Sequence, residues 1–186
     1  MNRWELPLHL TVGGKNYPIN GDFRDILEII AYLDDQNLPE FIRWQVALAL
    51  FYEGQIPEEH APEAMEKLAV FLNGGAQVTG RPGPRLLDWQ QDCGAIVSDV
   101  NRVAGQEIRG LKFLHWWTFL SWFHGVGEGQ LSTLVAIRER LACGKKLEDW
   151  QQEFYRKNRE AVALKKHYSP DELRHRAELN RLLNGE

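Results

Sequence analysis

The first stretch with a clear hydrophobic pattern, LPLHLTVGGKNYPI at 6–19, alternates apolar and polar residues on both sides of Gly13 and Gly14. A period of two is typical of half-buried strands. Two adjacent glycines accept the positive φ angles of a tight hairpin turn. We therefore expect two short strands that form a β-hairpin near the N-terminal end.

From Asp22 onward the apolar positions recur with the period of a helix. The first such run is followed by Asn37 and Pro39, which favour a helix cap and a first turn, and Gly54 follows that second helix. Further helices are expected over about 62–73, 88–104, 111–124 and 131–142. Another helix is expected to begin near 149. DWQQD at 88–92 and DWQQE at 149–153 are similar helix starts, in each of which we expect the Asp to cap the helix.

The composition changes after Gly144. Residues 145–186 contain ten Lys or Arg and eight Asp or Glu, about twice the charge density of the preceding chain. Their apolar stripe is narrow, and Ser169 begins a capping-box pattern that predicts a last helix. The fold class predicted is mainly α. A compact multi-helix body with a short N-terminal β-hairpin covers 1–144, and a charged helical C-terminal arm over 145–186, not an independent domain, packs on the body or on a partner.

The stretch LHWWTFLSWF at 114–123 concentrates aromatic residues. It is too short for a membrane span, which needs roughly 20 apolar residues. Polar residues fall at every third position from Lys112 to His124, so no polar face forms. We expect a central core helix with at least two deeply buried side chains. The alternative is that one side binds a partner, and Trp122 is then the first candidate. The candidate core or partner-binding aromatics are Trp116, Trp117, Phe119, Trp122, Trp150 and Phe154.

No arrangement of residues predicts catalysis, a cofactor or a metal site. The histidines lack an HExxH spacing, and Cys93 and Cys143 do not form a C-x-x-C pair. We expect His115 to be a buried histidine with a hydrogen-bond partner, and Asp92 to be a helix-surface or core-pairing residue. We therefore expect no enzyme. The enzyme alternative would require a pocket that joins His115 and Asp92, with or without His124.

The overall charge argues against a nucleic-acid-binding protein. The formal charge is −4, whereas such proteins are normally basic. Basic clusters in the arm, such as 156–159, are interleaved with acids and are expected to be a solvated helix face. A nucleic-acid-associated regulator that uses the basic arm is the alternative hypothesis.

Several motifs resemble the bacteriophage gene-product-fifteen family. The similar elements are V-x-G-x-x-Y-x-I followed by DFR at 12–24, ALALFY at 47–52, DWQQD at 88–92, LHWWTF at 114–119 and AIRER at 136–140. LHWWTF is the most specific of them, because two adjacent tryptophans after a histidine are rare. The similarity covers about 10–165, so the residues after 165 inherit nothing from it.

The resemblance implies a structural or assembly role in phage tails. Genes of this family lie in the tail-gene region, where tail assembly chaperones that coat the tape-measure protein are typically encoded. The implied partners are the tape-measure protein and the tail-tube protein, with self-association left open, no membrane and no cofactor. The implied location is the cytoplasm of the bacterial host, with a minor component of the virion as the alternative.

Overall fold

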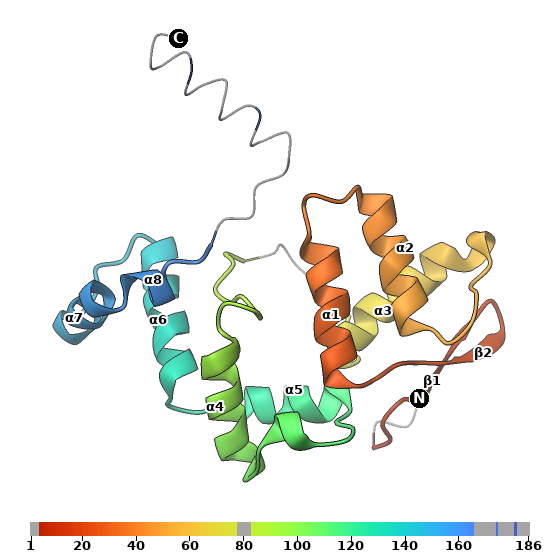
Figure 1. Cartoon of the computed structure of the whole chain (residues 1–186), viewed down its shortest axis with the longest axis horizontal. Helices are drawn as coiled ribbons and strands as arrows, with labels where there is room; N and C mark the ends of the chain where they lie inside the picture. The colour runs from red at the N-terminus through yellow and green to blue at the C-terminus, as the bar shows by residue number, and fades with distance from the viewer. Residues whose placement is uncertain (1–3, 78–82, 166–173, 175–180, 182–186) are drawn as a thin grey trace. The chain divides into compact units, whose positions relative to one another are not determined.

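The computed structural model describes residues 4–77 and 83–165, together with the single positions 174 and 181 (Figure 1). Within these residues the chain forms two strands and eight α-helices, with two short 3₁₀ turns. The prediction of a mainly α fold with an N-terminal β-hairpin and a helical C-terminal region is confirmed. The last helix expected from Ser169 lies outside the described residues.

The hairpin consists of β1 (His9–Val12) and β2 (Lys15–Pro18), which pair antiparallel with Leu10 opposite Tyr17. The turn between them uses Gly13 at φ 55° and Gly14 at φ 76°. Both angles lie in the left-handed region that residues with a Cβ rarely adopt, so the glycine pair determines the turn.

Three helices follow the hairpin: α1 (Phe23–Asp34), α2 (Glu40–Phe51) and α3 (Ala61–Leu72), with the 3₁₀ turn η1 (Glu58–His60) before the third. The cap expected at Asn37 is wrong, since Pro39 occupies the N-cap of α2. Asn37 instead donates from its backbone and side-chain nitrogens to Oδ1 of Asp35. Asn37 therefore belongs to a turn closed by the Asp35 side chain, which lies before the start of α2.

The remaining elements are α4 (Cys93–Ala104), the 3₁₀ turn η2 (Ile108–Gly110), α5 (Trp116–His124), α6 (Gln130–Ala142), α7 (Asp149–Lys157) and α8 (Arg159–Val162). Asp88 does not start α4. Its Oδ1 accepts hydrogen bonds from the backbone of Gln90 and Gln91, and this closes a separate turn before the helix.

The aromatic helix α5 begins five residues later than the hydrophobic pattern predicts. Leu114 O accepts a hydrogen bond from Phe23 N, and Trp116 N donates to Gly21 O. These contacts hold Leu114 and His115 in extended backbone beside residues 21–23. The sequence pattern could not reveal this pairing, because its partners lie about ninety residues apart.

The described residues divide into two compact units. The first, here called the aromatic unit, contains 4–6, 21–23, 69–77 and 83–165. The second contains 7–20 and 24–68 together with positions 174 and 181, and its residues 7–20 and 24–68 are here called the acidic unit. Residues 145–165 fall in the aromatic unit together with α4, α5 and α6. The predicted division into a body over 1–144 and an arm over 145–186 stays a prediction.

Candidate functional site

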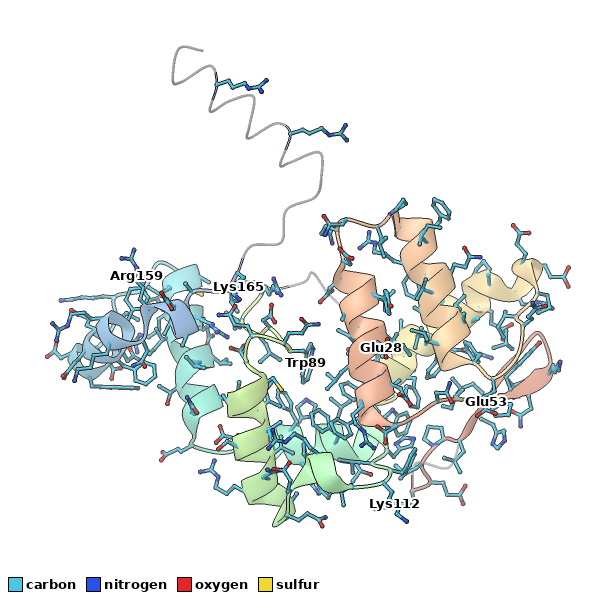
Figure 2. All side chains as sticks on the ribbon, viewed as in Figure 1. Glu28, Glu53, Trp89, Lys112, Arg159 and Lys165 are labelled. Atoms are coloured by element: carbon cyan, nitrogen blue, oxygen red, sulfur yellow. The ribbon has the colours of Figure 1, made fainter. Side chains whose placement is uncertain are left out.

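The side chains of α5 make up much of the interior of the aromatic unit. Trp116 and Phe119 are each about 1% exposed, so two of the expected side chains are deeply buried. The ring of Phe119 stacks on those of Trp116 and Phe23, with centroids 5.4 Å and 4.9 Å apart. Trp89, labelled in Figure 2, lies with its ring 5.1 Å from that of Phe123. The side of α5 that carries Trp116 and Phe119 therefore packs in the core of the aromatic unit.

Two tryptophans of α5 also provide hydrogen bonds for the end of another helix. Trp116 Nε1 donates to Leu72 O and Trp117 Nε1 donates to Phe71 O, each at 2.9 Å. Leu72 is the last residue of α3, and the last carbonyls of an α-helix lack partners within it. The adjacent tryptophans thus satisfy their own indole N–H groups and two terminal carbonyls of α3.

His115 is the N-cap of α5 and is only 2% exposed. Its Nδ1 accepts a hydrogen bond from Trp117 N at 3.1 Å, so the neutral ring carries its proton on Nε2. The ring meets Phe71 edge to face, and a Cβ at Gly21 would make a tight contact of 3.2 Å with it. His115 therefore occupies the buried, hydrogen-bonded role expected from the sequence.

The outer side of α5 is less enclosed. Trp117, Leu120 and Trp122 are half-buried. Trp122 makes neither a ring contact nor a side-chain hydrogen bond with any residue that the structure describes. Whether Trp122 belongs to a partner surface stays a prediction.

The candidate Trp150 lies in α7, whose N-cap differs from the expected Asp149. Glu148 is the N-cap and forms a capping box with Gln151, whereas Asp149 is the first helical residue. Trp150 is 53% exposed and donates from Nε1 to Glu148 Oε2. The hydrogen bonds from Trp150 and then Arg140 hold the pKa of Glu148 below its usual range. Phe154, on the same helix, is half-buried.

The main polar contact of the aromatic unit centres on Arg138 of α6 and was not predicted from the sequence. Its guanidinium binds both carboxylate oxygens of Asp92, at 2.6 Å and 2.8 Å, and both side chains are almost fully buried. It also donates to the carbonyls of Leu86, Ala161 and Val162. All five guanidinium N–H groups can be used in this way, so the charge is fully compensated. The only sequence signal was AIRER, an arginine between apolar helix positions.

Gln91, in the turn before α4, binds the backbone of the residues that follow α8. Its Nε2 donates to Ala163 O at 2.8 Å, and its Oε1 accepts from Lys165 N at 3.0 Å. Figure 2 labels Arg159, the first residue of α8, and Lys165, which follows the helix. Residues 159–165 are thus fastened to α6 and to the turn before α4 through Arg138 and Gln91.

These contacts define what the polar residues do. Asp92 is engaged by Arg138, while His115 caps α5, so each has a structural role of its own. No group of three potential metal ligands occurs in the residues that the structure describes. Among those same residues, no helix has both the length and the apolarity needed to cross a membrane.

Comparison with known proteins gives one informative result. Neither the curated proteins nor the solved structures contain a match. The model of the family described as Bacteriophage Gp15 protein matches residues 4–164. This range includes the hairpin, α1 to α8, the paired tryptophans of α5 and the Arg138–Asp92 contact. The chain therefore belongs to the Bacteriophage Gp15 protein family.

Proposed function

We propose that this phage protein is a non-enzymatic tail assembly chaperone that acts on the tape-measure protein in the cytoplasm of the bacterial host. The observation that carries the proposal is the family match over 4–164, since the family resemblance implies a gene in the tail region. A chaperone of this kind needs surfaces that bind a long helix, and it needs no active site.

The polar interior of the aromatic unit supports a non-enzymatic role. A general base or nucleophile must present a side chain that a substrate can reach. Asp92 and His115 are each at most 3% exposed and take part in contacts that hold helices together. Asp92 and His115 therefore have a sufficient structural explanation.

The residues proposed to bind a partner are Trp122, Trp150 and Phe154. Trp150 is exposed, and Trp122 and Phe154 are half-buried. Tryptophan is enriched among the residues that contribute most to protein interfaces, because it offers a large rigid apolar surface and one hydrogen-bond donor.

Ion pairs made by residues of 145–165 favour a protein partner over nucleic acid. Lys157 binds Glu153 at 2.7 Å, and Arg140 binds Glu148 at 2.7 Å, so acids of the same chain already neutralise part of the positive charge. A nucleic-acid-binding surface would leave such cations available for phosphates.

The proposal is tested by co-expression with the tape-measure protein of the same phage. We expect the tape-measure protein to become soluble and to co-purify with this chain, and we expect Trp122→Ala and Trp150→Ala to weaken that association. A matched control is Val103→Ala, since Val103 is also an exposed apolar residue of the aromatic unit.

Two results would contradict the proposal. The tape-measure protein would be equally soluble without this chain, or the chain would be found in purified virions in a fixed ratio to the tail-tube protein. The second result would establish a minor component of the virion instead. A gene for the tape-measure protein directly downstream would support the chaperone.

A further inference from the structure

Helix α2 of the acidic unit is apolar nearly all round, yet one side of it is exposed. Between Phe41 and Phe51 the only charged residue is Arg43, whose Nη1 donates to Leu33 O at 2.8 Å. Only Ala47 and Phe51 of this helix are fully buried. The helix therefore presents an uncharged side, with Phe41 68% exposed, that its own unit does not cover.

The solvent-facing line of α2 can be identified by its spacing. Phe41, Gln45 and Ala49 are exposed and lie four residues apart, so they follow one another along the same side of the helix. Trp44 and Leu48, which are half-buried, lie beside this line. A surface helix normally has charged residues on its outer side, and an uncharged outer side is typical of an interaction surface.

Acidic residues stand at both ends of this line. Asp34, Asp35 and Glu40 precede or begin α2, and Glu53, labelled in Figure 2, follows it. None of these four carboxylates has an ion-pair partner among the described residues. Residues 7–20 and 24–68 contain ten Asp or Glu and four Lys or Arg, which gives the acidic unit a formal charge of −6.

We propose that the outer face of α2, formed by Phe41, Gln45 and Ala49, binds a basic amphipathic helix of a partner protein. The apolar side of such a helix covers the uncharged line, and its Lys and Arg residues meet the carboxylates at the two ends. A second copy of this chain fits less well, because two acidic units of the same charge repel each other. The inference goes beyond the proposed function, since this surface belongs to the unit that lacks α5 and does not require the tape-measure protein as its partner.

The test uses the full chain and a fluorescently labelled synthetic peptide of about four helical turns. The peptide has Leu on one side of the helix and Lys on the other. Two control peptides are a scrambled sequence of the same composition and a peptide with Glu in place of Lys. Fluorescence anisotropy measures binding at low and high salt. We expect only the ordered Leu–Lys peptide to bind, and we expect its affinity to fall as salt is added.

Variants of the chain then locate the surface. Phe41→Ser and Ala49→Arg are expected to weaken binding by about tenfold or more, as loss of a central interface contact does. Asp34→Asn combined with Glu53→Gln is expected to weaken it and to flatten its salt dependence. Phe113→Ser is the matched control, because Phe113 is 55% exposed, close to the 68% of Phe41, but belongs to the aromatic unit.

Circular dichroism of each variant verifies that it is folded, and Ala49→Arg tests the surface independently should Phe41→Ser unfold. The proposal is overturned if the Leu–Glu or the scrambled peptide binds equally well, or if Phe113→Ser weakens binding as much as Phe41→Ser. It is also overturned if sedimentation shows a dimer that Phe41→Ser dissociates, since a second copy then covers α2.

Discussion

Helices α5 and α2 are both almost uniformly apolar, but they differ in how much of their apolar surface is buried. In α5 the rings of Trp116 and Phe119 are buried, and His115 caps the helix with its side chain. Helix α2 has no side-chain hydrogen bond at its N-cap, and its Phe41 is mostly exposed. Apolar composition alone therefore does not place a helix in a core.

The difference follows from the polar contacts that accompany each helix. The indole N–H groups of Trp116 and Trp117 bind the terminal carbonyls of α3, which fixes α5 against a defined neighbour. The exposed residues of α2 carry no comparable donor toward a described carbonyl, apart from the inward-facing Arg43. Directional contacts thus decide which apolar side becomes interior.

The largest expected effect distinguishes the two helices directly. Trp116→Ala should lower the free energy of unfolding by about 3–5 kcal/mol, because it removes a fully buried ring and leaves Leu72 O without its donor. Urea denaturation followed by circular dichroism measures this change. Trp117→Ala should cost less, since Trp117 is half-buried. If Trp116→Ala unfolds at the wild-type urea concentration, α5 is not a core helix.

A loss of similar size is expected at Arg138. Arg138→Ala leaves the Asp92 carboxylate buried without its partner, which typically costs about 3–5 kcal/mol. Deletion of 145–186 should also destabilise the protein, because it removes the carbonyls of Ala161 and Val162 that bind Arg138. Deletion of 166–186 keeps those acceptors and serves as the control. Equal unfolding free energies for the two deletions would mean that 145–165 contributes nothing to the aromatic unit.

A smaller loss of stability is expected for a substitution at Gly75, which lies against the Trp117 side chain of α5. Gly75 has φ 87°, and a Cβ there would approach Trp117 Cη2 to 2.9 Å. Gly75→Ala should cost about 1–3 kcal/mol through backbone strain and displacement of the indole. Tryptophan fluorescence would report the displaced ring, and urea denaturation the lost stability. Gly105→Ala is a useful control, since its φ is also positive but nothing lies within 4 Å of the added Cβ. The same loss in both variants would assign the whole effect to the backbone.

The smallest effect is expected for Phe41→Ala in α2. A largely exposed side chain contributes little to the folded state, so the unfolding free energy should change by no more than about 0.5 kcal/mol. Trp122→Ala should be closer to this value than to that of Trp116→Ala. Thermal unfolding of the three variants side by side establishes the order. A large loss for Phe41→Ala would show that α2 belongs to an interior, which contradicts a partner surface there.

The sequence by itself determined the elements whose causes are local. Gly13 and Gly14 specify the hairpin turn because they accept positive φ, and the helical spacing from Phe23 to Leu33 specifies α1. The concentration of aromatic residues at 114–123 indicated a buried helix, and Trp116 and Phe119 in it are buried. The stretch is also shorter than the roughly 20 apolar residues that a membrane span needs. The family was recognisable from the same short motifs.

Only the tertiary structure decided the contacts between distant residues. The start of α5 depends on residues 21–23, and the role of Arg138 depends on Asp92 and on carbonyls of α8. The exposed face of α2 likewise could not be read from its apolar composition. Local spacing determines which side chains share a helix face, but burial depends on which elements meet that face, and that information lies far away in the chain.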